Sequence, residues 1–396
     1  MMPVGRTPSP ARSVLFQTGV RRRGPLRKRL LAVTGALAVL LVIAIVLASW
    51  FVSGLLIDPH HDLVNDNIET LAVGHGRIVL VRTHDSQRNG VYGLDWPSGH
   101  AIVGNLISVT PSTVTRRLMA LTGRLPHHAK VGLDPDVWTT NPRAALGIDY
   151  RSMTFPDPLG PMPAWLVADR GSTWVILVHG IDGSRTGGLR PLASLHGIGF
   201  PTLVIDYRND VGAPASSDGH IDLGMTEWRD LEAAVRWALQ HGAQRFVLYG
   251  DSMGGSIVTR FMHLSPLSGK VSALVLDAPV LDWAGVIDDQ ASRRDLPFMA
   301  PPVKWMIGSR INVSWSALDQ IAQARSFHLP ILLFQGTDDA LVPSAESRAF
   351  ARTAPGPVTY VPVSGAGHIE SWNANPTAYE SHLRQFLSPY APPAHP

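Results

Sequence analysis

An apolar segment, Phe246–Tyr249, leads straight into GDSMGG (residues 250–255) and then into a helical pattern that reaches Leu264. A serine held between two glycines at such a strand-to-helix turn has a strained backbone, and larger side chains at the glycine positions would collide with the neighbouring strand and helix. The turn lifts the Ser252 hydroxyl clear of the sheet, and the helix N-terminus adds positive potential beside it. The string alone can occur by chance, but its strand and helix neighbours indicate that Ser252 is a nucleophile.

The strand-and-helix pattern around Ser252 extends over about residues 150–390. Several of the strands are unbroken apolar runs, as expected for strands buried on both faces of a sheet. The pattern predicts an α/β fold, a mostly parallel sheet flanked by helices. The expected strands are Ala164–Ala168, Trp174–Val178, Thr202–Ile205, Phe246–Tyr249, Ala273–Leu276, Ile331–Phe334 and Thr359–Val361, and the expected helices are Glu227–Gln240, Met253–Leu264 and Thr377–Leu387.

The acid and the base of a serine catalyst on this kind of turn follow the serine along the chain. The strand Ile331–Phe334 runs into QGTDDALVP (residues 335–343), so an aspartate there is placed to orient an imidazole. Spacing does not choose between Asp338 and Asp339, and Asp277, which also follows a strand, is an alternative acid.

A general base must accept the serine proton, and histidine has a suitable pKa. Three histidines follow the aspartate pair. His382 falls within the last expected helix and His395 within a proline-rich tail, whereas His368 lies in the loop GAGH after the last expected strand. We therefore expect His368 to be the base.

The loop HGIDG (residues 179–183) follows the strand Trp174–Val178. In this type of site that loop offers one backbone N–H to an oxyanion, and the residue after the serine offers the second. We assign the pair to Ile181 and Met253. We expect His179 to brace the loop rather than to catalyse.

Taken together, GDSMGG, GTDDALVP, GAGH and VHGIDG resemble the α/β-hydrolase superfamily over about residues 150–390. The resemblance implies an α/β-hydrolase fold, cleavage through an acyl-enzyme, and Asp339 as the acid, since the family's acid usually stands in D-x-x-V-P. The most similar branch contains carboxylesterase-like, prolyl aminopeptidase-like and acylaminoacyl peptidase-like members. The family inserts a helical lid at a position that here covers about residues 278–328.

The expected lid carries large apolar side chains that could line a substrate pocket or pack on the body of the enzyme. They are Trp283, Phe298, Met299, Trp305, Met306, Ile307 and Trp315. In DYRND (residues 206–210) we expect a buried Asp–Arg pair that supports the loops, and Glu227 and Asp230 are interpreted as favourable charges at a helix N-terminus.

The other strong signal is a run of 28 residues, Leu30–Ile57, without a charged side chain. Eight basic residues and no acidic ones precede it, and acidic residues follow it, so the positive-inside rule predicts a single-pass transmembrane helix with the N-terminus in the cytoplasm and the rest of the chain outside, at the cell membrane. A cleaved signal peptide is the alternative, but its apolar core would be shorter.

Without the eight basic residues the chain holds 26 basic and 31 acidic residues, which argues against nucleic-acid binding. We expect a disordered basic tail (1–29), the transmembrane helix (30–57), a partly β N-terminal extension (58–150) with a helix at Thr113–Leu121, the hydrolase domain (151–390) and a short tail (391–396). The sequence holds no metal or cofactor motif.

The resulting hypothesis is a serine hydrolase that cleaves an ester, thioester or amide bond of a small-molecule, lipid or peptide acyl substrate. An aminopeptidase of the same fold is the first alternative, and it would need acidic groups near the pocket to hold an amine. The second is a catalytically silent hydrolase fold that serves as a binding module at the cell envelope.

Overall fold

The computed structural model describes residues 25–60 and 67–392, with residues 25–28 as helical backbone. The chain forms two compact units, which divide between Ala48 and Ser49. Most of the expected disordered tail, residues 1–24, and the last residues, 393–396, lie outside the described part. Residues 25–29, which we expected to belong to the tail, are instead helical.

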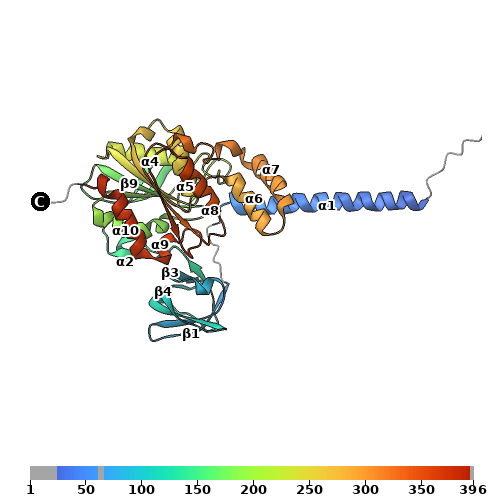
Figure 1. Cartoon of the computed structure of the whole chain (residues 1–396), viewed down its shortest axis with the longest axis horizontal. Helices are drawn as coiled ribbons and strands as arrows, with labels where there is room; N and C mark the ends of the chain where they lie inside the picture. The colour runs from blue at the N-terminus through green and yellow to red at the C-terminus, as the bar shows by residue number, and fades with distance from the viewer. Residues whose placement is uncertain (1–24, 61–66, 393–396) are drawn as a thin grey trace, which may run out of the picture. The chain divides into compact units, whose positions relative to one another are not determined.

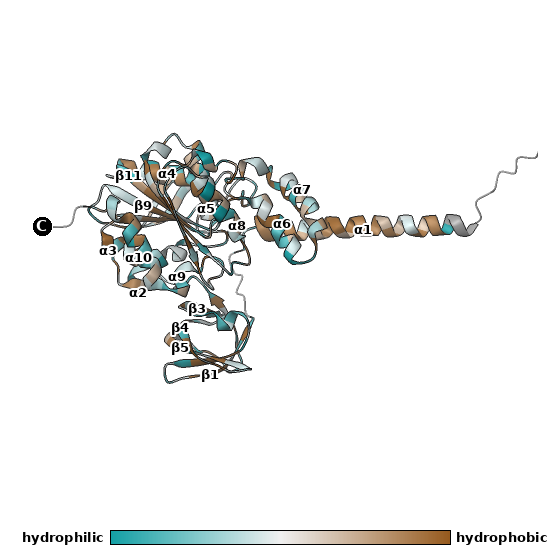
Figure 2. Ribbon diagram, viewed as in Figure 1, coloured by the Kyte–Doolittle hydropathy of each residue, from teal (hydrophilic) through white to brown (hydrophobic). Residues whose placement is uncertain are grey.

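Helix α1 (Pro25–Ile57) is apolar along nearly its whole length, as Figure 2 shows by its colour. Its segment Arg29–Ile57 is long and apolar enough to cross a membrane, and it is the one such helix among the described residues. The last two turns differ from the rest. Ile57 is fully buried in the main core, and its carbonyl accepts a hydrogen bond from the Ile221 N–H at 2.8 Å. The expected anchor therefore ends inside the second unit, not before it.

Residues 68–134 form a closed antiparallel barrel in the order β1-β2-β5-β4-β3-β6. Its strands are β1 (Ile68–Gly74), β2 (Arg77–Val81), β3 (Tyr92–Trp96), β4 (Gly99–Val109), β5 (Thr113–Gly123) and β6 (Lys130–Asp134). A small apolar core of its own fills the barrel. We expected a partly β extension, and the structure shows a complete barrel instead.

The predicted helix Thr113–Leu121 is wrong, because these residues form strand β5. In the first half of β5 burial alternates with a period of two: Val114 and Arg116 are buried, and Thr115 between them is half-buried. A fully buried arginine at an inward position hides the apolar alternation by which a strand is normally found.

The rest of the second unit is built on an eight-stranded sheet in the order β14-β13-β12-β11-β9-β10-β8-β7 (Figure 1). All seven expected strands are present, and β7 was missed. The pairs β10–β9, β9–β11, β11–β12, β12–β13 and β13–β14 are parallel. Strand β8 is antiparallel to both β10 and β7. The strands are β7 (Arg151–Asp157), β8 (Gly160–Val167), β9 (Thr173–Val178), β10 (Thr202–Ile205), β11 (Arg245–Asp251), β12 (Val271–Asp277), β13 (Ile331–Gly336) and β14 (Val358–Val363).

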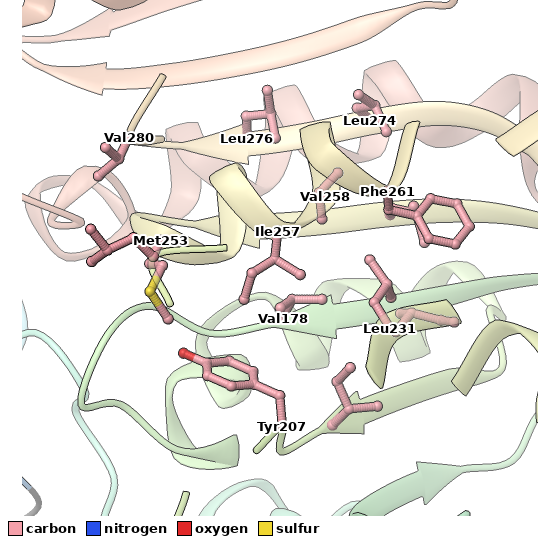
Figure 3. Close-up of a cluster of buried hydrophobic side chains, with 14 of the residues drawn as sticks. Val178, Tyr207, Leu231, Met253, Ile257, Val258, Phe261, Leu274, Leu276 and Val280 are labelled. Carbon is pink, nitrogen blue, oxygen red and sulfur yellow. The ribbon is translucent and has the colours of Figure 1, made fainter. Parts of the chain in front are cut away.

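Helices cover both faces of this sheet, and alternate strand residues enter the two cores. In β9, for example, Ile176 and Val178 belong to one core and Val175 and Leu177 to the other. Figure 3 shows part of the first core, in which Ile257 and Phe261 pack over the strands. The helices are α2 (Pro142–Leu146), α3 (Leu189–Ile198), α4 (Trp228–Gln240), α5 (Met253–Leu264), α6 (Trp283–Arg293), α7 (Ala300–Ile311), α8 (Ser344–Thr353), α9 (Ser371–Ala374) and α10 (Pro376–Leu387).

A helical insertion, with α6 and α7 as its longest elements, lies between β12 and β13, where a lid was expected. Its large side chains differ in burial, and Met299 and Trp315 are half-buried. Trp283, Met306 and Ile307 are buried, and the Trp283 ring N–H donates to the Ser256 hydroxyl at 3.1 Å. Phe298 and Trp305 are instead 60% and 68% exposed, so these two serve neither a core nor a closed pocket.

The buried end of α1 allows a test of the packing of Ile57 in the core. Ile57→Ala should lower the free energy of unfolding by about 2–5 kcal/mol, the usual cost of truncating a buried isoleucine. Leu41→Ala, in the same helix but 62% exposed, should leave it unchanged in detergent. Chemical denaturation of the detergent-solubilised full chain measures both. Equal effects of the two substitutions would contradict the packing of Ile57 in the core.

Candidate active site

The loop between β11 and α5 holds Ser252 in a backbone conformation that few residues adopt. Its φ is +50° and its ψ is −121°. The turn is also crowded: a Cβ on Gly250 would lie 2.4 Å from the Gly254 carbonyl oxygen, and a Cβ on Gly254 would lie 2.1 Å from that of Val178. Only glycine fits these two positions, so the GDSMGG sequence is a requirement of the turn itself.

The imidazole of His368 lies between the two other residues that the sequence suggested for a catalytic triad. Its Nε2 is 2.8 Å from the Ser252 Oγ, and its Nδ1 is 2.9 Å from Oδ2 of Asp339. With a proton on Nδ1, the ring donates to the carboxylate and leaves Nε2 free to accept the serine proton. The three side chains thus form a continuous chain of hydrogen bonds, in which Asp339 orients the imidazole.

The Asp339 carboxylate is held by more than its histidine. Its Oδ1 accepts the N–H groups of Leu341 and Val342, each at 2.8 Å, and its Oδ2 accepts from the Gln335 side chain at 2.9 Å. Burial by itself would raise the pKa of Asp339, but the hydrogen bond and charge of His368 and the two N–H groups outweigh it and lower the pKa. Asp339 is therefore ionised at neutral pH.

The two alternative acids have other partners. Asp338 is exposed and accepts from the Thr337 hydroxyl at 2.9 Å. Asp277 is buried and accepts from the Ser371 hydroxyl at 2.7 Å, and burial raises its pKa. Of the three carboxylates, Asp339 is the one that bonds to His368.

Two backbone N–H groups near Ser252 were expected to bind an oxyanion. Met253 is the first residue of α5, so its N–H has no partner in a preceding helical turn. The loop after β9 lies against the serine, because a Cβ on Gly180 would come within 2.8 Å of the Ser252 Cβ. We expect the N–H groups of Met253 and Ile181 to converge beside Ser252.

The peptide between Gly180 and Ile181 is fixed from its carbonyl side. The Gly180 oxygen accepts from His179 Nδ1 at 2.8 Å and from the Tyr207 hydroxyl at 2.7 Å. Figure 3 shows Tyr207 beneath Met253, with its hydroxyl turned towards the end of β9. In a trans peptide the C=O and N–H point in opposite directions, so this clamp directs the Ile181 N–H away from His179 and Tyr207.

His179 is itself held by buried carboxylates. Its Nε2 lies 2.9 Å from Asp210, and Asp206 pairs with the Arg185 guanidinium at 2.8 Å. Burial alone would lower the pKa of His179, but the charge and hydrogen bond of Asp210, with the charge of Asp206, raise it to about 9. His179, Asp206 and Asp210 also have the spacing of a metal site. The imidazolium and Arg185 already supply the positive charge that the two carboxylates need.

The ion pairs of this region differ in part from the expectation. Arg208 does not pair within residues 206–210; its guanidinium bonds to Asp230 of α4 at 2.6 and 2.9 Å. Asp230 lies in the first turn of α4, as expected, and is also a buried ion-pair partner. Glu227 is also buried, and it accepts the N–H groups of Asp222 and Gly224 at 2.7 and 2.9 Å. Arg208 and Asp230 are 22 positions apart, so spacing gives no sign of this pair.

Arg190 of α3 is one further residue at the site, and no sequence pattern reveals it. It is almost completely buried, and its guanidinium bonds to Asp251, next to the serine, at 3.2 Å and to the Ile369 carbonyl, next to the histidine, at 2.5 Å. Its place in an amphipathic helix is unremarkable in sequence. Its contacts tie the serine turn to the histidine loop.

A mostly parallel sheet with a strained serine after β11, an aspartate after β13 and a histidine after β14 is the arrangement of an α/β-hydrolase. Residues 171–320 match the family described as serine aminopeptidase, S33, and residues 69–134 match a domain of unknown function, DUF8805. The chain has the fold of the α/β-hydrolase superfamily, and residues 171–320 carry the sequence match to one of its families.

Solved structures share this fold. An esterase from Pyrococcus furiosus aligns with a TM-score of 0.52 and 19% identity over 65% of this chain and 96% of its own, and a second crystal form gives 0.51 and 20% over 64% and 98%. By sequence, an uncharacterized protein of Mycobacterium tuberculosis is 26% identical over 218 residues, 54% of this chain and 69% of that protein. The uncharacterized protein YfhR of Escherichia coli O157:H7 is 23% identical over 245 residues, 60% and 77%.

The two adjacent aspartates provide a matched pair of substitutions. Asp339→Asn should lower kcat by about 10⁴-fold, because an amide cannot hold the imidazole in the tautomer that the reaction needs. Asp338→Asn should leave kcat nearly unchanged, since its side chain is exposed and bonds to Thr337. Steady-state hydrolysis of a p-nitrophenyl ester compares them. The opposite order of effects would assign the acid to Asp338.

Proposed function

We propose that this protein is a membrane-anchored serine hydrolase that cleaves an ester, thioester or amide bond through an acyl-enzyme intermediate. One observation carries the proposal: the His368 imidazole lies 2.8 Å from the Ser252 hydroxyl and 2.9 Å from the Asp339 carboxylate. In this geometry His368 removes the serine proton as the hydroxyl attacks a carbonyl carbon.

The proposed reaction has two halves. In the first, the Ser252 oxygen bonds to the carbonyl carbon, its proton moves to His368 Nε2, and the oxyanion is stabilised by the N–H groups of Met253 and Ile181. The tetrahedral species then expels the leaving group, which takes the proton from His368. In the second half, water attacks the acyl-enzyme and gives its proton to His368. The tetrahedral species then collapses, the acid is released, and His368 returns the proton to the Ser252 oxygen.

Two observations bear on the substrate class. The similar structure from Pyrococcus furiosus is an esterase, which supports hydrolysis of a small ester. The match of residues 171–320 to a serine aminopeptidase family supports an aminopeptidase as the second candidate. A series of p-nitrophenyl esters of increasing chain length, tested beside aminoacyl p-nitroanilides, separates the two. Turnover of the anilides alone would favour the aminopeptidase.

Membrane anchoring is the other part of the proposal. The segment Arg29–Ile57 has the length and hydropathy of a single membrane span. Basic residues cluster before it, which places the N-terminus in the cytoplasm and the hydrolase outside under the positive-inside rule. The site would then act on substrates outside the cytoplasm.

A fluorophosphonate probe tests the nucleophile, because it bonds covalently to a serine that a general base has activated. The wild-type full chain should label, Ser252→Ala should not, and His368→Ala should label slowly. Ser256→Ala is the matched control on the same helix, since the Ser256 hydroxyl bonds to the Val280 carbonyl. In-gel fluorescence with intact mass spectrometry reports the result. Folded wild-type protein that stays unlabelled would support the silent binding module instead.

A C-terminal reporter tests the orientation. Alkaline phosphatase, which is active only outside the cytoplasm, should be active when fused after Pro396, because eight basic residues precede the uncharged run. A fluorescent protein that folds only in the cytoplasm should stay dark at the same position. The reverse pattern in whole cells would contradict the proposed topology.

A further inference from the structure

The loop that carries His368 has a strained and partly charged framework. Ile369, directly after the histidine, has a positive φ of +53°, a costly conformation for a β-branched residue. Glu370 is 3% exposed, and its Oε2 accepts the Gly367 N–H at 2.9 Å, which closes the loop around His368. A buried carboxylate needs compensating charge or hydrogen bonds to stay ionised.

That compensation comes from the barrel. The Arg88 guanidinium forms an ion pair with Oε1 of Glu370, and the Tyr92 hydroxyl donates to Oε2 at 3.1 Å. Arg88 follows the short 3₁₀ helix Asp85–Gln87 between β2 and β3, and Tyr92 begins β3. Both residues therefore reach the histidine loop from one end of the barrel.

Inside the barrel, Arg116 holds this end in place. Its guanidinium donates to the carbonyls of Ser86, Arg88 and Gly90 at 3.2, 2.5 and 2.9 Å. Its Nε also donates to the Gly104 carbonyl at 3.1 Å. The inward arginine that hides strand β5 in the sequence thus fixes the segment 86–90, and with it the position of Arg88.

A second group of contacts joins the same barrel end to α9, just after the histidine loop. The Val91 N–H donates to the Asn373 carbonyl at 3.0 Å, and the Asn373 side chain donates to the carbonyls of Val91 and Pro135 at 2.7 and 2.9 Å. At Gly90 a Cβ would lie 2.1 Å from the Asn373 carbonyl oxygen. The backbones at Gly90 and Asn373 approach so closely that only glycine fits at position 90.

We propose that the barrel of residues 68–134 is a positioning module for the catalytic histidine: through Arg88 and Tyr92 it holds Glu370, and through Glu370 it sets the place of His368 against Ser252. This inference rests on the proposed function. Arg88 touches neither substrate nor a reacting atom, so it is a positioning residue. The proposal gives the barrel, which matches a domain of unknown function, a role in catalysis.

Arg88→Ala in the detergent-solubilised full chain tests the inference. Loss of the ion pair should let the His368 loop shift, and kcat for a p-nitrophenyl ester should fall about 10- to 100-fold with KM nearly unchanged, because small displacements of a catalytic group are costly. Arg117→Ala, an exposed arginine of the same barrel, is the matched control. Arg88→Lys keeps the charge and should recover part of the lost rate.

A merely structural role for Arg88 would change the melting temperature and leave kcat of the folded fraction intact. Active-site titration with the fluorophosphonate therefore normalises each rate to the folded enzyme. A kcat for Arg88→Ala equal to that of Arg117→Ala would overturn the inference. Wild-type protein that neither labels nor turns over ester would instead refute the proposed function.

Two milder variants decide the case in which Arg88→Ala does not fold. Tyr92→Phe removes only the hydroxyl that donates to Glu370 and should lower kcat by a few-fold. Glu370→Gln removes the charge that Arg88 pairs with, and in the double variant with Arg88→Lys the losses should be less than additive, as for residues that act through one another. A full kcat in Tyr92→Phe together with additive losses would refute the role of the barrel.

Discussion

The hydrogen bonds that hold the His368 imidazole between Ser252 and Asp339 impose the strictest geometric demand on this fold. Three parallel strands, β11, β13 and β14, end at one edge of the sheet, and each of the three residues follows one of them. The parallel register thus gathers residues separated by as many as 116 positions. The register alone does not place the three side chains to within a few tenths of an ångström. The contacts around their loops do so.

Buried charges provide most of those contacts. Arg190 ties Asp251 to the histidine loop, His179 and Tyr207 clamp the peptide before Ile181, and Arg88 reaches Glu370 from the barrel. Removing one partner of a buried pair costs about 3–5 kcal/mol, since the other charge stays uncompensated. Each loop of the site therefore has a discrete position, because a shifted loop would leave an unpaired charge inside the protein.

The sequence predicted the sheet well and the supporting contacts poorly, for a physical reason. Strands such as Thr202–Ile205 are buried on both faces, so composition alone identifies them, and the serine turn is confined by glycines that local sterics require. Strand β5 was mistaken for a helix because Arg116 faces inward. The Arg208–Asp230 and Arg88–Glu370 pairs span distant segments, and no local pattern encodes such a pairing.

The segment after α1 also supports the candidate site. Beyond the buried Ile57, Asp58 pairs with Arg310 of α7 at 2.7 Å, and the His60 N–H donates to the Asp182 side chain at 2.8 Å. Asp182 follows Ile181, whose N–H is expected to face the oxyanion. The segment after α1 thus contacts both the helical insertion and the loop that carries one of the proposed oxyanion donors. The residues that directly follow the apolar helix therefore form part of the framework of the candidate site.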